Sequence, residues 1–417
     1  MNLLKISTNN LQDKPLTTSL SILLMALGIA IISLLLLAGK QIEEKFSRNV
    51  AGIDMVVGAK GSPLQLILAS IYQIDSPTGN ISMEEANRLT RSPLVKSTIP
   101  LSMGDSYKGY RIVGSSEKYI THFQAEFETG NVFSKAMEMV VGNKVAKNLG
   151  LKVGDAFSSQ HGFDGEGKAH EEKQFKVVGV LKTTNSVLDA LMITPLESVW
   201  AVHDEHHEAE VGKGANALKL LEEDNVGANS IRPPEEEDSK EITALLVKFR
   251  NPAMGMMRSI NQNSTLQTAT PAIEINRLFA LLGVGVDALK WIALVIIIVS
   301  GLSVFVSLYN SLKERKYEMA LMLSMGASRT KLFLLLLSEG LIISVIGFII
   351  GIFLSRFGLW IMSENVEQNF HYDFNVLSLL TEEFYLLLGA LFIGLLAATI
   401  PSLGIYNINI SKTLADE

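Results

Sequence analysis

The sequence contains no cysteine, which excludes disulfide bonds and every metal or catalytic site that depends on a thiol. It also lacks the local patterns of common hydrolases, such as a nucleophile elbow or a His-Glu-x-x-His helix. The glycine-rich segment 162–168 matches most of a phosphate-binding loop, but Ala169 stands where a Ser or Thr hydroxyl must reach the magnesium ion. We therefore expect no catalytic residues and no nucleotide-binding domain in this chain.

Charge is scarce over four long stretches. The chain of 417 residues is 48% hydrophobic and 19% charged, with a mean hydropathy of +0.28, which is typical of membrane segments joined to a soluble part. The apolar runs are Pro15–Gly39, Trp291–Leu312, Leu332–Ser355 and Phe384–Ile405. Each is long enough to cross a hydrocarbon layer of about 30 Å. The first run exceeds the roughly 7–15 residues of a signal-peptide core, so we predict an uncleaved membrane helix.

Positive charge is unevenly distributed between the connections. The short connection 313–331 carries Lys313, Arg315, Lys316, Arg329 and Lys331. Segment 356–383 has a single cation, Arg356, among several acids. By the positive-inside rule, the first connection lies in the cytoplasm and the second outside. Both termini are then cytoplasmic, and the long segment between the first two helices lies outside.

These patterns predict a membrane α-helical protein with four transmembrane helices and a large extracytoplasmic α+β domain inserted between helices 1 and 2. The predicted parts are a lead with helix 1 (1–40), the stalk and α+β domain (41–288), helix 2 (289–312), a cytoplasmic connection (313–331), helix 3 (332–355), an extracytoplasmic loop (356–383), and helix 4 with a cytoplasmic tail (384–417).

Within the inserted domain, alternating or β-branched runs predict strands, and glycine-closed segments predict helices. The predicted strands are Lys108–Val113, Gln174–Leu181 and Ile242–Phe249. Segment 139–151 is expected to be a strand end that feeds a helix, and a further helix is expected after Asn251-Pro252. Four-residue spacing of Ile42, Phe46 and Val50 predicts that helix 1 continues as a stalk. Residues 64–72 are expected to form an amphipathic helix near the membrane surface.

An acidic segment, Ala201–Glu241, holds 12 acids and 4 bases, so the rest of the chain is close to neutral. It contains His203, His206 and His207, whose spacing suits one helical face of a Zn²⁺ site. His161 and His170 are candidates for the remaining ligands. The alternatives are a weak, exchangeable metal-sensing loop and a solvated segment without a site. No basic patch outside the membrane flanks indicates a nucleic-acid partner.

Glu339 is an acid inside the third apolar run. A carboxylate in hydrocarbon is costly and marks a function or a partner. Its position near the cytoplasmic end leaves Arg329, Lys331 or a neighbouring hydroxyl as expected partners. We favour a role in helix packing or coupling over a proton pathway.

Four stretches resemble the MacB/FtsX-like permease family of ABC transporters. The segment Ser7…Asn10-Leu11…Lys14-Pro15-Leu16-Thr17-Thr18 is similar to the family's usual lead into its first helix. The segment Glu314-Arg315-Lys316-x-Glu318-Met319-Ala320, followed by Ser324-Met325-Gly326-Ala327-Ser328-Arg329, is similar to the family's coupling signature. Residues 140–155 (VVGNKVAKNLGLKVGD) resemble a recurrent sequence motif of the family's outer domain. Ala398-Thr-Ile-Pro401 resembles the family's motif at the end of the last helix. The topology is similar to that of the LolC and LolE subunits. The acidic insertion and the run Val57–Gln65 depart from the common framework.

The resemblance implies a site for an ATPase on the cytoplasmic connection. The implied coupling residues are Glu314, Arg315, Lys316, Glu318, Met319, Gly326, Ala327 and Ser328. Met319, Leu321, Met322 and Leu323 are expected to give a short helix an adaptable apolar face, Gly326 to end it, and Ser328 to cap the next helix.

The implied function is that of a permease subunit in the bacterial inner membrane. A separate cytoplasmic ABC ATPase would hold ATP and Mg²⁺, a second permease subunit would complete a homo- or heterodimer, and a periplasmic or outer-membrane partner would receive the cargo. Lipoprotein, peptide and drug-like cargo all stay open. The alternatives are a non-transporting FtsX-like regulator of a cell-envelope enzyme, a zinc-linked transport component, and a metal-binding membrane protein without an ATPase.

Overall fold

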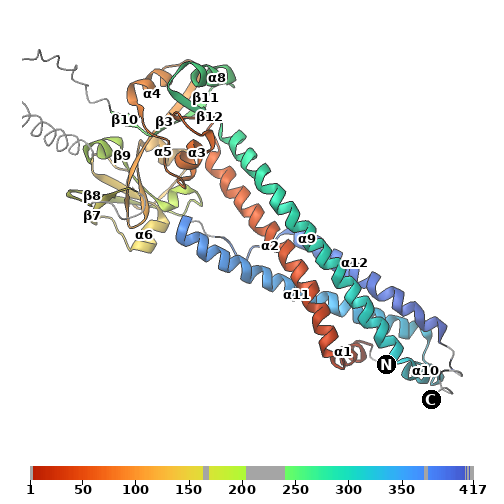
Figure 1. The fold of residues 1–417 in the computed structure, drawn as a ribbon. Helices are drawn as coiled ribbons and strands as arrows, with labels where there is room; N and C mark the ends of the chain where they lie inside the picture. The colour runs from red at the N-terminus through yellow and green to blue at the C-terminus, as the bar shows by residue number, and fades with distance from the viewer. Residues whose placement is uncertain are drawn as a thin grey trace, which may run out of the picture. The chain divides into compact units, whose positions relative to one another are not determined.

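The computed structural model describes residues 3–162, 169–202, 240–370, 374–408, 410 and 413. The chain forms two compact units (Figure 1). The helical unit comprises Met1–Glu43 and Ala280–Glu417, and the inserted domain comprises Glu44–Phe279.

Helices make up the helical unit. They are α1 (Leu3–Gln12), α2 (Pro15–Val50), α9 (Pro271–Glu314), α10 (Lys316–Ser324), α11 (Arg329–Phe370), α12 (Thr381–Leu403) and the 3₁₀ turn η3 (Gly404–Asn407). The end of α2 from residue 44 and the start of α9 up to residue 279 belong to the inserted domain. In the described part of the chain, four helical spans are long and apolar enough to cross a membrane: Pro15–Val50, Pro271–Glu314, Arg329–Glu364 and Thr381–Asn407. The predicted fold class is therefore confirmed. Both α2 and α9 continue without a break beyond their apolar runs. For α2, the spacing of Ile42, Phe46 and Val50 predicted this continuation.

Small residues let the spanning helices approach closely. A Cβ added at Gly394 of α12 would lie 1.9 Å from Ser344 Oγ of α11, and one at Gly351 of α11 would lie 2.8 Å from the Ala26 carbonyl of α2. Lipid tails are as apolar as leucine, so such close packing replaces the hydrophobic effect as the force between membrane helices.

The inserted domain contains a mixed sheet of ten strands. Its order is β12-β1-β11-β3-β4-β9-β6-β8-β5, with β7 pairing with β3 and β8. The strands are β1 (Met55–Ala59), β3 (Val95–Tyr107), β4 (Tyr110–Ser115), β5 (Phe127–Gly130), β6 (Glu138–Val141), β7 (Ala156–His161), β8 (Ala169–Leu181), β9 (Leu191–Pro195), β11 (Ala244–Phe249) and β12 (Leu266–Ala269). A separate pair joins β2 (Ile81–Ser82) to β10 (Glu241–Ile242). Pairs β4–β9 and β6–β8 are parallel, and the remaining pairs are antiparallel.

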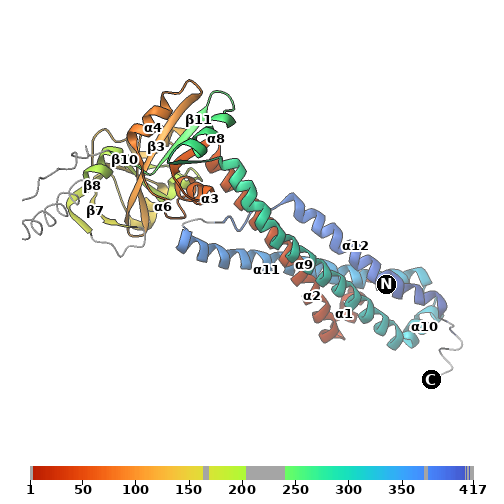
Figure 2. The ribbon, with the colours of Figure 1, turned by 45° about the horizontal axis from the view of Figure 1, so that its top comes forward.

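The sheet has two halves that meet along the 13-residue strand β3. The first half contains β12, β1 and β11. In the chain, β1 follows α2 and β12 precedes α9. The second half contains β4–β9 and is inserted between β3 and β11. Figures 1 and 2 show α4 (Met83–Thr90) and α8 (Met254–Asn263) beside β11, with β7 and β8 in the other half. One apolar core, containing Val56, Val113 and Leu188, serves both halves, and each half has a further core of its own.

The predicted strands correspond to β4, β8 and β11, and segment 139–151 to β6 followed by α6 (Asn143–Leu149). Gly150, with φ of +69°, closes α6 as a left-handed C-terminal residue. The domain also contains α5 (Glu117–His122) and the 3₁₀ turn η2 (Val187–Ala190).

The predicted surface helix at residues 64–72 needs correction. The segment is helical, as α3 (Pro63–Ile67) and the π-helical turn η1 (Leu68–Tyr72), but Leu66, Ile67, Ile71 and Tyr72 are at most 1% exposed and lie in the shared core. Apolar side chains on more than one face make this a buried helix, which its length alone could not show.

Candidate functional site

The connection between α9 and α11 contains the short helix that the sequence predicts. The chain leaves α9 at Arg315, forms α10, and turns at Gly326, whose φ is +92°. Ser328 Oγ then accepts a hydrogen bond from the Lys331 backbone N–H at 3.3 Å, which caps the start of α11.

Ion pairs fasten this connection to the N-terminal segment. Arg315 is 17% exposed and donates from Nη2 to Asp13 Oδ2 at 2.8 Å, while its Nε lies 3.7 Å from Glu318 Oε2. Lys14 pairs with Glu314. Two of the predicted coupling residues, Glu314 and Arg315, thus hold α10 in place through partners that the sequence did not indicate.

One side of α10 packs into the helical unit. Met319 and Ala320 are at most 2% exposed and belong to a core with Leu332, Leu335 and Ile405. Met322 and Leu323 lie partly buried against the same core. The predicted apolar face is therefore largely turned inward, apart from Leu321.

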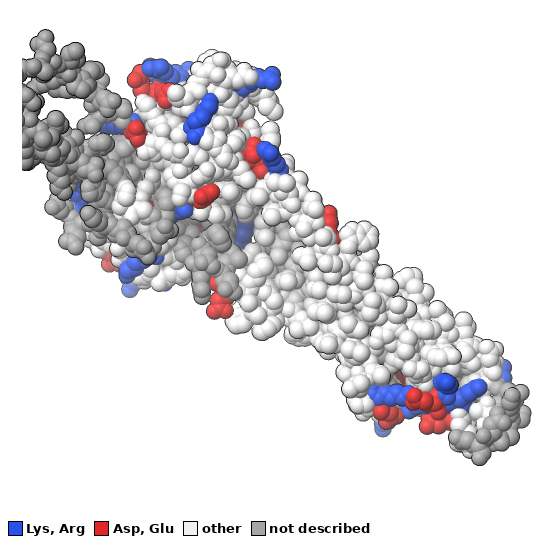
Figure 3. Space-filling model, in the orientation of Figure 1, with Lys and Arg blue, Asp and Glu red and all other residues white. Residues whose placement is uncertain are grey.

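The other side of α10 presents an apolar stripe. Tyr317, Leu321 and Met325 follow one another at four-residue spacing and are 40%, 44% and 80% exposed. Charged side chains gather at this end of the unit, next to a stretch of the helices that is almost free of charge (Figure 3). Lys316, Glu318 and Arg329, which are close to these three residues in the chain, are exposed. An exposed apolar strip rimmed by charge is typical of a surface that binds another protein. We call Tyr317, Leu321 and Met325 the α10 stripe.

Glu339 lies one helix away, in α11, and is 1% exposed. Its Oε1 accepts a hydrogen bond from Asn10 Nδ2 of α1 at 2.6 Å. The hydroxyls of Ser7 and Ser338 meet beside it at 2.6 Å. The described contacts thus give Glu339 an amide partner, whereas the sequence suggested Arg329, Lys331 or a hydroxyl. The N-terminal helix is thereby fastened to α11.

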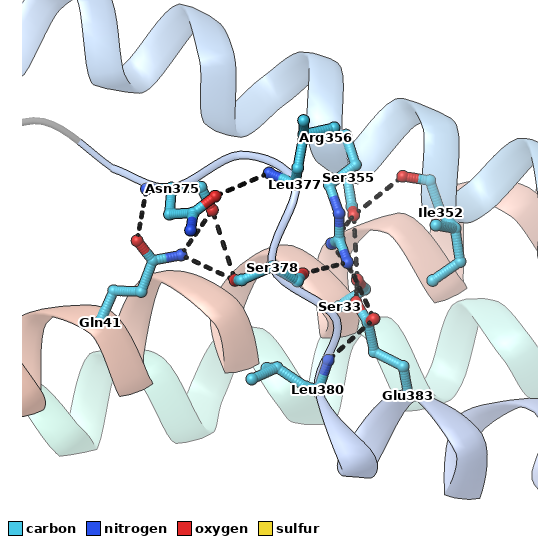
Figure 4. Close-up of polar contacts among 10 residues, drawn as sticks. All are labelled: Ser33, Gln41, Ile352, Ser355, Arg356, Asn375, Leu377, Ser378, Leu380 and Glu383. Atoms are coloured by element: carbon cyan, nitrogen blue, oxygen red, sulfur yellow. Dashed lines mark hydrogen bonds and ion pairs between the residues drawn. The ribbon is translucent and has the colours of Figure 1, made fainter.

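A second polar cluster, which the sequence did not predict, joins three helices where α12 begins (Figure 4). Arg356 Nη2 donates to Glu383 Oε2 at 2.8 Å and to the Ser378 carbonyl at 2.9 Å. Ser33 Oγ of α2 donates to Glu383 Oε1 at 2.7 Å and meets Ser355 Oγ at 2.9 Å. We call Ser33, Ser355, Arg356 and Glu383 the clamp. Its sequence signal was weak because Arg356 and Glu383 are 27 residues apart.

The predicted zinc ligands His203, His206 and His207 lie outside the described residues, as does the side chain of His170. His161 is described: its Nδ1 lies 3.5 Å from Asp105 Oδ1, at the end of β7. The described residues include no cluster of three or more His, Cys, Asp or Glu side chains that could hold a metal ion. The zinc site stays a prediction.

Family comparisons cover most of the chain. Residues 18–243, which are more than half of it, match the MacB-like periplasmic core domain, and residues 291–410 match the FtsX-like permease C-terminal model. The pyoverdine export ATP-binding/permease protein PvdT of Pseudomonas syringae pv. syringae is 24% identical over 81% of this chain, and that of Pseudomonas savastanoi pv. phaseolicola is 23% identical. The chain spans about half the length of these curated relatives, 49% in each case.

Two solved structures are similar to parts of the chain. The periplasmic region of MacB from Actinobacillus actinomycetemcomitans is 13% identical and covers 56% of this chain and 97% of its own, with a TM-score of 0.32. The extracellular domain of the ABC-type transporter YknZ from Gram-positive bacteria is 14% identical and covers 52% and 99%, with a TM-score of 0.28. On the two family matches, the chain belongs to the MacB/FtsX-like permease family of ABC transporters.

Proposed function

We propose that the chain is the transmembrane permease subunit of an ABC transporter of the bacterial inner membrane that works by mechanotransmission. A separate cytoplasmic ATPase, which binds ATP and Mg²⁺, docks on the α10 stripe. Its closure moves α10, and the helices carry that movement to the inserted domain outside the membrane.

The observation that carries this proposal is the continuity of α9. This helix begins at Pro271, directly after β12 and Thr270, and ends at Glu314, beside Arg315 and α10. Its 44 residues span about 66 Å at 1.5 Å per residue. An unbroken helix resists bending, so a push at one end is delivered to the sheet at the other.

The polar groups inside the helical unit support mechanical work over a hydrophilic channel. Ser21 and Ser303 bond each other at 2.8 Å, and Ser344 donates to the Gly340 carbonyl at 3.0 Å. The clamp likewise satisfies its own charges. These buried groups are paired within the protein, which favours cargo that is handled outside the membrane.

The curated relatives are named as pyoverdine exporters, which supports export as the direction and a peptide-like or drug-like cargo. Extraction of a lipoprotein would use the same device. We infer that two permease subunits, alike or different, act with two ATPases, and that a periplasmic or outer-membrane partner accepts the cargo.

The docking step is tested with Leu321→Glu in the full chain, purified with its ATPase. A charge in the middle of an interface costs about 2 kcal/mol or more of binding free energy. The affinity for the ATPase, measured by its retention on the purified permease, should therefore fall by roughly 30-fold. Thr8→Glu places the same charge at an exposed position of α1 and should leave retention unchanged.

Retention of the ATPase by Leu321→Glu at the level of Thr8→Glu would contradict docking on the α10 stripe. Export is then separated from the FtsX-like regulatory alternative by measuring ATP-dependent release of cargo from vesicles that contain the complex. A regulator hydrolyses ATP without releasing cargo.

A further inference from the structure

The last turn of α2 enters the inserted domain beside a tight turn, Thr184–Ala190. Asn49 is 1% exposed, and its Oδ1 accepts a hydrogen bond from the Val187 backbone N–H at 3.0 Å. Arg48 Nη1 lies 3.4 Å from the Thr184 carbonyl. The end of the first stalk thus contacts a segment that is 138 residues away in the chain.

The backbone N–H groups of this turn show why Asn49 matters. Asp189 accepts from the N–H groups of Thr184 and Asn185, both at 2.8 Å. The Ser186 hydroxyl and carbonyl accept from Leu188 and Asp189. The turn therefore supplies its own acceptors, whereas the N–H of Val187 bonds to a side chain of the stalk.

Residues Thr184–Ala190 also contact the second half of the sheet. A Cβ added at Gly142 would lie 2.1 Å from the Leu188 carbonyl, so the start of α6 rests directly on the turn. Thr183 Oγ1 donates to Asn143 Oδ1 at 3.0 Å, and the Gly142 N–H donates to the Leu191 carbonyl at 2.9 Å. A displacement of the turn must therefore displace α6 and β6.

The second half of the sheet has no direct chain connection to either stalk. In the chain, α2 leads into β1 and α9 follows β12, and these two strands pair with each other in the first half. The contacts that join the second half to the stalks include β3, the shared core and the polar contacts of Arg48 and Asn49, and His122 bonds to the Ala51 backbone just after α2. The contact of Asn49 is buried and directional, so it resists sliding of the turn along the stalk, which apolar packing alone tolerates.

We propose that Asn49 is a positioning residue that makes the second half of the inserted sheet follow the movement of α2, through the Val187 N–H and the turn Thr184–Ala190. This inference rests on the proposed mechanotransmission. It names the contact through which the movement of α2 reaches the second half of the sheet, which the chain does not connect directly to either stalk.

Hydrogen–deuterium exchange on the full chain in lipid nanodiscs tests the joint itself. Asn49→Ala removes the acceptor and should speed exchange at Val187 roughly tenfold. Asn49→Asp keeps an acceptor oxygen and should keep most of the protection. The matched control, Asn148→Ala, removes a hydrogen bond to Tyr110 Oη in the same half and should leave Val187 unchanged.

Spin-label distances test the transmission. The absence of cysteine lets labels be placed without background. One pair joins Glu44→Cys to Lys147→Cys, from the stalk to α6, and the other joins Glu44→Cys to Leu281→Cys, from stalk to stalk. In the complex with its ATPase, the distance between the labels at residues 44 and 281 should change on ATP binding. The Glu44–Lys147 distance distribution should keep a single, narrow peak. With Asn49→Ala, the Glu44–Lys147 distribution should broaden or split in the ATP state.

The outcomes separate the two proposals. If the distance between the two stalk labels does not change on ATP binding, mechanotransmission is wrong. A stalk pair that responds, with a Glu44–Lys147 distribution unaffected by Asn49→Ala, overturns the role of Asn49 alone. If Asn49→Ala does not fold, Asn49→Leu preserves the side-chain shape without the acceptor and gives the same two readings.

Discussion

Removing the positive charge of the clamp should destabilise the helical unit strongly. Arg356→Met leaves Glu383, whose side chain is 6% exposed, without its cation. Glu383 keeps the donated bonds from Ser33 Oγ at 2.7 Å and from the Leu380 N–H at 3.3 Å. These two neutral donors do not replace a guanidinium, because a buried carboxylate needs an opposite charge to offset its lost hydration.

The expected cost follows from the geometry. Breaking a buried ion pair by removing one partner costs about 3–5 kcal/mol. Replacing both, in Arg356→Met with Glu383→Met, removes the unpaired charge and leaves only neutral groups without partners, such as the Ser378 carbonyl. Each such group costs about 1–3 kcal/mol, so the double variant should be no worse than the single one.

The measurement is a double-mutant cycle of unfolding free energies for the full chain in detergent. The coupling energy between Arg356 and Glu383 should be at least about 2 kcal/mol. Ser33→Ala should cost about 1–3 kcal/mol because it removes a donor to a buried charge, whereas Ser19→Ala, at an exposed position of the same helix, should cost almost nothing. If each single variant loses less than about 1 kcal/mol of unfolding free energy and the two losses are additive, the clamp does not stabilise the protein.

Two further predictions concern local contacts. Backbone N–H groups of Ser134 and Lys135 lower the pKa of Glu138 below its usual 4.5. The folded state therefore gains stability from Glu138 above about pH 4.5 and loses it as the pH falls through the lowered pKa, and protection of the two amides should vanish over the same range. Glu138→Gln should abolish that pH dependence, and an unchanged profile would contradict it. Asn10→Ala should destabilise α1 by about 1–3 kcal/mol in a protease-nicking assay, whereas Glu339→Gln, which keeps an acceptor, should be tolerated; equal sensitivity of both would argue against the bond.

The four spanning helices could be predicted from the sequence because lipid imposes one rule on every residue of a span. Apolar runs of membrane length, such as Trp291–Leu312, leave helix as the structure that satisfies the backbone. The short helix between α9 and α11 was also predictable, because Gly326 and Ser328 act on their own neighbours: a left-handed residue ends one helix and a hydroxyl caps the next. Strands β4 and β8 were signalled by local alternation for the same reason.

Contacts between distant segments were decided by the tertiary structure. Met319 and Leu321 are both apolar in the sequence, yet one is buried and the other lies on the α10 stripe, because the packing of α11 determines which side of α10 is covered. The partners of Arg356, Glu339 and Asn49 lie 27, 329 and 138 residues away. A hydrogen bond requires that two groups lie close together in space. Neither the charge pattern nor the periodicity of the sequence shows which distant residues lie close together. The sequence thus determined where helices cross the membrane, and the fold decided which polar groups fasten them together.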